Sequence, residues 1–173
     1  MLEILSKRRT VRKFDSKRMV EKEKIEEIVQ AGLHAPSGKN LQAGEIFVIT
    51  NPEFRKALVK INAEIGQFPL GFDSFYGAPV ILVVAAKDCP YTDLDGAAMI
   101  ENMLLEATNQ GLSTCWIHRA KAEFEMEGVK ELFASYGIDI SGYVGVDHIA
   151  LGYGLGEQAK PKAIRPGRVH YIE

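Results

Sequence analysis

Residues 94–110 place the strongest constraint on the fold, because they predict a helix that is apolar on nearly every side. Its apolar positions form two opposite stripes, one of Ala97, Ile100, Leu104 and Ala107 and one of Ala98, Met99, Met103 and Leu105. A helix with this pattern is buried all round. In a chain of 173 residues, the simplest cover for the second side is another copy of the chain. The pattern therefore predicts a homodimer, with Asp93 capping the helix and Gly111 ending it.

The other periodic segments predict a sheet surrounded by helices. Helices are expected at residues 2–6, 21–33, 51–65 and 125–136, and strands at residues 45–50, 79–86, 113–117 and 148–151. Asn51 followed by Pro52 is typical of a helix start. The continuous Val-Ile-Leu-Val-Val run within residues 79–86 indicates a central strand that is buried on both faces.

Three further segments lack a regular period. Residues 36–42 form a polar loop rich in turn-forming residues. The segment from Phe68 to Tyr76 carries four aromatic residues, which are unfavourable to expose, so we expect it to cover a partner subunit or a flat ligand. Residues 152–173 predict an extended C-terminal arm. Only residues 168–172 look strand-like, and a terminal strand of this kind often pairs with a neighbouring sheet edge.

The composition is that of an ordinary globular protein, and residues 1–173 fit one domain. A net charge of −2 argues against general nucleic-acid binding. No apolar run approaches the roughly 20 residues that span a bilayer, and the first residues do not resemble a signal peptide. The two cysteines, Cys89 and Cys115, form no CxxC pair, which favours a reducing cytoplasm.

Several well-known motifs fail on inspection. Gly38-Lys39 lacks the spacing, the preceding strand and the Ser or Thr of a phosphate-binding P-loop. The glycines at positions 152, 154 and 156 are not followed by the helix of a dinucleotide fingerprint. The four histidines are scattered, so no metal site is expected, and we interpret His148 and His170 as loop or half-buried polar residues. No nucleophile elbow is present, and no catalytic side chain is predicted.

Cationic residues are concentrated near both ends of this slightly acidic chain. Residues 7–13 hold five cationic side chains in seven positions, and the tail adds Lys162, Arg165 and Arg168. Guanidinium groups bind oxyanions bidentately, and the Thr10 hydroxyl can add a hydrogen bond. Taken alone, the first cluster is better explained as a solvated basic turn, because basic clusters are common on surfaces. Together, the two clusters indicate one anion that is held from both ends of the sequence.

The order of four motifs resembles the FMN-dependent nitroreductase family. Arg8-Arg-Thr-Val-Arg-Lys-Phe14 is similar to its Arg-Arg-Ser-x-Arg-x-Phe motif, and Ala35-Pro-Ser-Gly-Lys-Asn-Leu-Gln42 is similar to its Ala-Pro-Ser-x-x-Asn-x-Gln loop. Gly77-Ala-Pro79 before an apolar strand also matches, as does the Gly-Leu-Ser-Thr-Cys-Trp run that ends at Trp116. With the basic tail, the resemblance covers essentially the whole chain.

The resemblance implies an α+β fold with a central, mostly antiparallel sheet flanked by helices. It also implies a homodimer that exchanges its C-terminal arms and holds FMN at the subunit interface. The implied cofactor-binding residues are Arg8, Arg9, Thr10 and Arg12 on the phosphate and pyrimidine, Pro36, Ser37, Gly38 and Asn40 on the isoalloxazine from the other subunit, Trp116, Ile117 and His118 through backbone groups, and Lys162 and Arg165 on the phosphate. Because Lys162 and Arg165 are spaced one residue wider than in the common tail pattern, Arg168 stays an alternative.

The implied activity is an oxidoreductase in which FMN takes a hydride from NADH or NADPH and passes electrons to a nitroaromatic, a quinone or another flat acceptor. One departure leaves room for alternatives, because Ala43-Gly44 stands where the family often has Pro-Trp. A related flavoenzyme for dehalogenation or metabolite dehydrogenation is one alternative, and an FMN carrier without turnover is another. In each case the flavin, and not a protein side chain, carries the redox chemistry.

Overall fold

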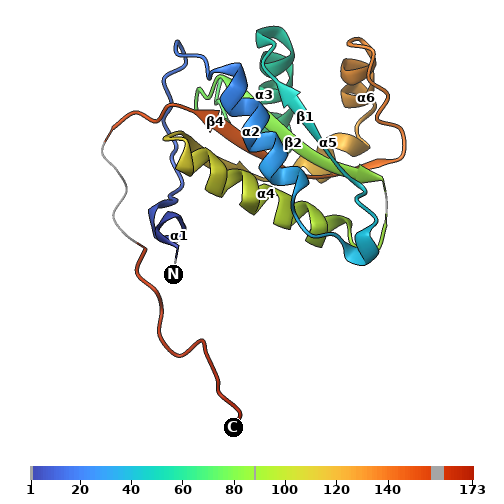
Figure 1. Ribbon diagram of the computed structural model, residues 1–173. Coiled ribbons are helices and arrows are strands. Elements are labelled where there is room, and N and C mark those ends of the chain that lie inside the picture. The colour runs from blue at the N-terminus through green and yellow to red at the C-terminus, as the bar shows by residue number, and fades with distance from the viewer. Residues whose placement is uncertain (1, 88, 157–161) are drawn as a thin grey trace.

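The computed structural model describes residues 2–87, 89–156 and 162–173, and it has three layers with a sheet in the middle (Figure 1). The helices are α1 (Glu3–Lys7), α2 (Lys22–Leu33), η1 (Gly38–Asn40), α3 (Pro52–Ile65), α4 (Thr92–Asn109), α5 (Ala120–Glu125) and α6 (Glu127–Ala134). The strands are β1 (Gly44–Ile49), β2 (Val80–Lys87), β3 (Ser113–Ile117) and β4 (Tyr143–Gly152). The arm that follows β4 extends away from the layers.

The four strands form one antiparallel sheet in the order β1-β2-β4-β3. β2 lies between β1 and β4, as its unbroken apolar sequence predicts, and only its last residue, Lys87, is exposed. β1 and β3 therefore form the two edges of the sheet. The predicted antiparallel sheet flanked by helices is confirmed, and the positions of the edges determine where other segments can attach.

The alternation of side chains along β2 builds a core on each face of the sheet. Val80, Leu82 and Val84 face α2 and α4, whose buried residues include Ile28 and Met103. The intervening residues of β2 face α3, α5 and α6, and there the core contains Leu58, Phe124 and Phe133. Successive strand side chains point to opposite faces, so one apolar strand supplies both cores.

Three predictions about the elements were wrong in detail. The helix expected at residues 125–136 is α6, and the short helix α5 before it was not predicted; Met126, with extended backbone angles, separates the two. The strand expected at residues 148–151 runs from Tyr143 to Gly152, and it buries His148 completely. α4 begins at Thr92 and has Tyr91 at its N-cap, which places Asp93 in the first turn.

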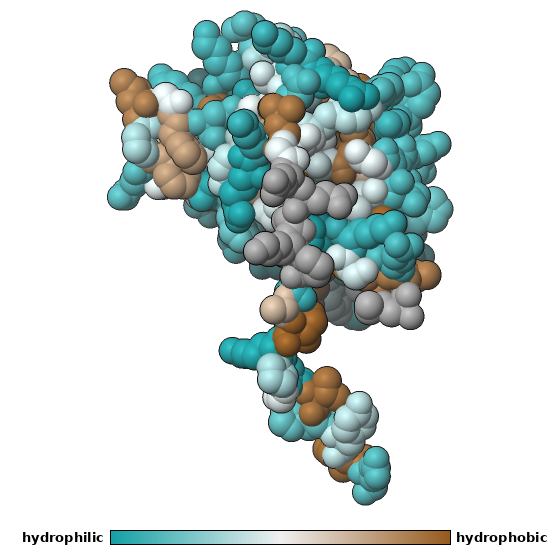
Figure 2. Space-filling view, turned by 90° about the vertical axis from the view of Figure 1, so that its left-hand side faces the viewer, coloured by the Kyte–Doolittle hydropathy of each residue, from teal (hydrophilic) through white to brown (hydrophobic). Residues whose placement is uncertain are grey.

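One side of α4 and residues 162–173 of the arm remain open in the single chain. Leu94 is 74% exposed, and Ala97, Ala98 and Leu105 are half-buried, so the helix is not covered on every side. Residues 162–173 are all exposed and contain no strand, and Figure 2 shows their hydrophobic side chains standing clear of the body. The predicted strand at residues 168–172 therefore has no partner strand among the residues that the structure describes.

Candidate functional site

The N-terminal arginine segment is attached to the free edge of β3. Thr10 forms a parallel bridge with Thr114, and the Val11 backbone N–H donates to the Thr114 carbonyl oxygen at 2.9 Å. Phe14 is buried in the core and forms a second bridge with Gly154. The aromatic anchor and the strand-like bonds together fix the backbone of a segment whose other side chains are mostly polar.

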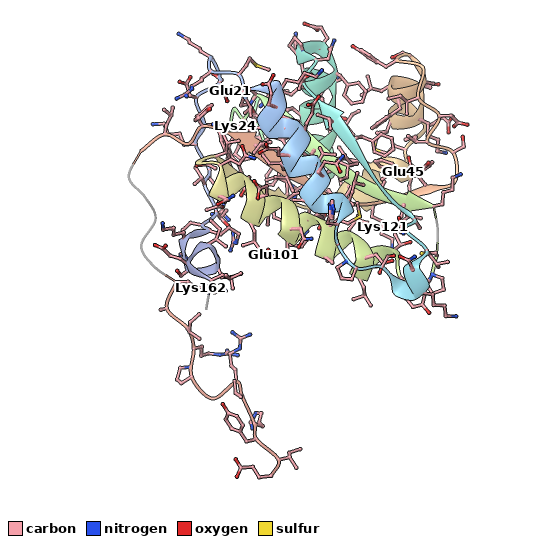
Figure 3. The ribbon with its side chains drawn as sticks, viewed as in Figure 1. Glu21, Lys24, Glu45, Glu101, Lys121 and Lys162 are labelled. Carbon is pink, nitrogen blue, oxygen red and sulfur yellow. The ribbon has the colours of Figure 1, made fainter. Side chains whose placement is uncertain are left out.

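Unpaired polar atoms mark the same edge of the sheet. Arg9 Nε and Thr114 Oγ1 are buried and have no hydrogen-bond partner among the described residues. Arg8 Nε lies 3.8 Å from Glu101 of α4, which Figure 3 labels. Burial raises the pKa of the Cys115 thiol, and the positive charge of Arg12 partly opposes that rise. The edge therefore combines three guanidinium groups with buried donors that a ligand can satisfy.

The end of β3 holds two aromatic side chains around one carboxylate. The indole Nε1–H of Trp116 donates to Asp147 Oδ2 at 2.7 Å, and His118 Nδ1 lies 2.7 Å from the same oxygen. Ile117, between them, points to the opposite core. Arg119 then takes a left-handed conformation with φ of 91°, and the chain turns into α5. β3 thus presents Trp116 and His118 on one face of the sheet.

A buried polar network lies behind this turn. Glu123 and His148 are both fully buried, and Glu123 Oε2 lies 2.8 Å from His148 Nε2. His148 Nδ1 is 3.2 Å from the carbonyl oxygen of Ile117, and Asn62 Nδ2 donates to the carbonyl oxygen of His118 at 3.2 Å. Asn62 also donates to Glu123 and accepts from Arg119 Nε. The network fixes the backbone of residues 117–119 from below.

The loop at residues 36–42 is held by the first turns of α4. The Gly38 N–H donates to both carboxylate oxygens of Asp95, at 3.0 and 3.1 Å, and the Gln42 N–H donates to Ser37 Oγ. Asn40 has φ of 56°, a conformation that asparagine tolerates better than most residues. Pro36, Ser37 and Asp95 border a cavity of about 170 Å³.

The carboxylate of Asp73 holds the aromatic loop, Phe68 to Tyr76, in place. The Asp73 carboxylate accepts hydrogen bonds from the N–H groups of Phe75 and Gly77, and Arg55 Nη2 lies 2.6 Å from Asp73 Oδ2. Phe75 is fully buried, while Phe68 stacks against Phe72 and lies under the guanidinium of Arg119, 5.0 Å from the ring centre. The loop therefore reaches the same turn that ends β3.

The structure brings some of the predicted site residues together and leaves others apart. Residues 8–12 and 116–118 share one edge of the sheet through the bridge of Thr10 to Thr114. The loop at residues 36–40 lies at the end of α4 where that helix begins, whereas α1 lies toward the other end (Figure 1). Lys162, Arg165 and Arg168 are exposed on the arm and form no ion pair with the described residues; Figure 3 labels Lys162.

Sequence reasoning missed the residues that position the site. Asp95 and Asp147 are acids that hold a loop and two aromatic rings, and Glu123 is an acid inside the core. The predicted half-buried position of His148 was wrong, because its ring is buried against Glu123 and Phe75. The one sequence signal is that Asp147 and His148 interrupt an apolar run. His170, in contrast, is exposed on the arm, and Cys115 is a small residue of the core.

Neither a metal-binding cluster nor a membrane-spanning helix is present among the described residues. Across residues 2–87, 89–156 and 162–173, no three His, Cys, Asp or Glu side chains are placed to hold a metal ion. No helix within these same ranges has the length and apolar character needed to cross a membrane.

The fold defines a known structural class. It matches a crystal structure of a nitroreductase with bound FMN from Bacteroides fragilis with a TM-score of 0.86, at 24% identity and over 100% of both chains. It also matches an FMN-dependent nitroreductase from Clostridium difficile R20291 with a TM-score of 0.77, at 27% identity and over 99% of this chain and 98% of that one. The predicted α+β nitroreductase fold is confirmed.

The sequence gives the same answer independently. Residues 5–153 match the nitroreductase family, so the chain belongs to that family. A protein of Methanothermobacter thermautotrophicus, provisionally named an NADH dehydrogenase/NAD(P)H nitroreductase, is 27% identical over 139 residues, which cover 78% of this chain and 69% of the relative.

Proposed function

We propose that this protein is an FMN-dependent oxidoreductase that carries electrons from NADH or NADPH to a flat acceptor such as a nitroaromatic or a quinone. The observation that carries the proposal is made at the edge of β3. Arg9 Nε and Thr114 Oγ1 are buried there and have no hydrogen-bond partner among the described residues, and Arg8 and Arg12 belong to the same segment. Leaving a buried polar group unpaired costs about 1–3 kcal/mol, so this edge favours a ligand rich in oxygen acceptors. Relatives that are named FMN-bound or FMN-dependent support the choice of FMN.

The residues present fit the chemical groups of FMN. Arg8, Arg9 and Arg12 supply guanidinium groups for the phosphate and the polar edge of the pyrimidine, and Thr10 supplies a hydroxyl. A cation near the pyrimidine favours the reduced ring, which carries negative charge there. When bound, FMN accepts a hydride and passes its electrons on. The loop from Phe68 to Tyr76 is proposed as the cover of the acceptor, since it reaches the turn after β3 through Arg119.

A second subunit is part of the proposal, because one chain leaves complementary surfaces open. The side of α4 that carries Leu94 is uncovered, and the arm exposes Ile164, Val169, Tyr171 and Ile172. β1 is a free edge bordered by cavities of about 470 and 410 Å³, one on each side. We infer that the arm that follows β4, within the expected range 152–173, pairs with β1 of the partner, and that residues 36–40 reach the cofactor of the other subunit.

The dimer is tested by sedimentation of single variants. Ile172→Asp places a charge in the arm, and the expected result is a shift from dimer toward monomer. Leu70→Asp is the matched control, since Leu70 is fully exposed on a different segment, the aromatic loop. If the two variants dimerise equally well, the arm is not part of the interface.

The function is tested by the visible spectrum of the purified protein. A yellow protein that NADH or NADPH bleaches without oxygen, and that a quinone or nitroaromatic recolours, is the expected result. Protein that stays colourless after incubation with FMN contradicts the proposal. Bound flavin that nicotinamide cannot reduce indicates a carrier, and reduced flavin that neither acceptor reoxidises indicates dehalogenation or metabolite dehydrogenation.

A further inference from the structure

His118 and Asp147 form a dyad at the open end of β3 that no part of the proposed electron transfer uses. The His118 side chain is 77% exposed, whereas Asp147 is 13% exposed and holds His118 Nδ1 at 2.7 Å. Asp147 comes from β4 and His118 from the residue after β3, so their contact crosses between paired strands. An exposed imidazole oriented by a largely buried carboxylate is an arrangement that moves protons.

The hydrogen-bond donors decide how the dyad is protonated. The indole Nε1 of Trp116 can only donate, so Asp147 Oδ2 acts as the acceptor for it at 2.7 Å. The same oxygen is an acceptor for His118, which requires that Nδ1 carry a proton. The second ring nitrogen, Nε2, is therefore the one left free to give and take a proton. Trp116 and Asp147 set both the tautomer and the direction of the ring.

The other charged groups around His118 do not pair with it, and most of them contact other residues. Arg119 donates to Asn62 and lies over the Phe68 ring. Glu123 of α5 is paired with His148 of β4. From the remaining elements nearby, Asp95 of α4 accepts from Gly38, and Lys121 of α5 is exposed with no ion pair among the described residues. Asp147 is thus the one carboxylate in this described region that pairs with His118.

Resting on the function proposed above, we propose that His118 is the proton donor to the acceptor and that Asp147 and Trp116 are its positioning residues. When bound, the reduced flavin would supply a hydride to one oxygen or ring position of a quinone, which would become a hydroquinone anion. The His118 Nε2–H bond then breaks, and its proton goes to the anionic oxygen to give the neutral hydroquinone. Neutral His118 regains a proton from water, so charge and electrons balance.

The first readout needs no turnover, because Trp116 is the only tryptophan of the chain. Its ring centre lies 6.5 Å from that of His118, close enough for a protonated imidazole to quench its fluorescence. A pH-dependent change in tryptophan fluorescence is expected in the native protein and in His34→Gln. It is expected to vanish in His118→Gln. If the pH-dependent signal persists in His118→Gln, then His118 is not the group whose protonation changes the Trp116 fluorescence, and the proposal is overturned.

The second readout separates proton delivery from electron transfer. In His118→Gln, turnover with a quinone is expected to fall by roughly 100-fold or more, the usual contribution of a positioned acid. Turnover with ferricyanide, which accepts one electron and no proton, is expected to stay unchanged, as is reduction of the flavin by nicotinamide. Free imidazole is expected to restore quinone turnover in His118→Ala, because the site is open to solvent.

The outcomes distinguish this inference from the function on which it rests. If the native protein reduces neither quinone nor ferricyanide, the proposed function fails. If it reduces both and His118→Gln behaves like the native protein, only the proton donor is wrong. Equal losses with both acceptors also overturn the inference, because they assign His118 to holding the flavin. Asp147→Asn keeps an acceptor for Trp116, and a loss confined to the quinone is expected there too.

Discussion

Glu123 Oε2 and His148 Nε2 lie 2.8 Å apart inside the protein, with neither side chain exposed to solvent. The pair ties α5 to β4 and, through the carbonyl oxygen of Ile117, to the end of β3. Because buried charges are tolerated only when they are paired, this contact is a point where the core and the proposed site depend on each other.

Removing one member of this pair is predicted to destabilise the protein strongly. His148→Leu leaves the carboxyl group of Glu123 buried without its hydrogen-bonding partner, and breaking a buried ion pair in this way costs about 3–5 kcal/mol. Urea unfolding at a fixed protein concentration measures the change as a lower midpoint. The double variant Glu123→Met, His148→Leu is expected to recover part of the loss. A single variant as stable as the native protein would show that the pair is not charged.

The loop at residues 36–42 is predicted to tolerate no side chain at position 38. A Cβ on Gly38 would lie 2.3 Å from Cγ of Tyr91, far inside contact distance. Gly38→Ala is expected to cost about 1–3 kcal/mol through overpacking, and the penalty is expected to disappear in a Tyr91→Ala background. Gly128→Ala is the control, because open space surrounds that helical glycine. Stability is read from urea unfolding.

The arginine segment is predicted to hold the cofactor. Arg8→Ala or Arg12→Ala removes a charge-assisted hydrogen bond worth about 1.5–3 kcal/mol, equivalent to a roughly 10- to 150-fold weaker retention of FMN. Fluorescence of released flavin during dilution measures this retention. Lys17→Ala, an exposed cation outside the cluster, should retain FMN normally. Unchanged retention in both arginine variants would move the phosphate to another part of the protein.

The dependence of folding stability on pH is predicted to involve Tyr153. Its hydroxyl donates to Glu21 at 2.6 Å, and this bond is the main cause of a Glu21 pKa below the ordinary value of 4.5. A lowered folded pKa adds stability above the unfolded value, and that stability is lost as the pH falls through the folded value. Tyr153→Phe is therefore expected to be less stable than the native protein near neutral pH. The difference should shrink to nothing in strong acid, as measured by thermal unfolding across pH.

The two thiols are predicted to react at different rates. Cys115 is buried and its thiol pKa is raised by that burial, so little reactive thiolate forms. Cys89 is partly exposed and should react first with a thiol reagent that produces colour. One fast equivalent followed by a second only on unfolding is the expected trace. Two fast equivalents would show that the β3 edge opens in solution.

Local sequence patterns predicted most of the framework. The strands β1, β2 and β3 and the helices α2, α3 and α4 lie within one or two residues of their predicted bounds, because apolar period and caps are local signals. β4 was predicted too short because its first half carries Gly145 and Asp147. Gly145 is explained only by the fold, since a Cβ there would lie 2.3 Å from the Ala120 carbonyl oxygen. The break at Met126 carries no such local signal.

The candidate site was predicted less completely, for a physical reason. The arginine segment and the residues at the end of β3 each belong to a motif whose members are neighbours in the sequence. Asp147, Asp95 and Glu123 act on groups 25 to 57 residues away, so their partners come close only after the chain has folded. An isolated acid in a sequence gives no indication of which ring or amide it will hold.

The bridge between Thr10 and Thr114 also dictates when the site can form. Ribosomes add about 5–20 residues per second, so the arginine segment leaves the ribosome several seconds before the strand that receives it. Until β3 has been synthesised, this basic segment lacks the strand with which it pairs. Contacts this distant in sequence form slowly, which makes the assembly of the arginine edge one of the last events in the maturation of the newly made chain.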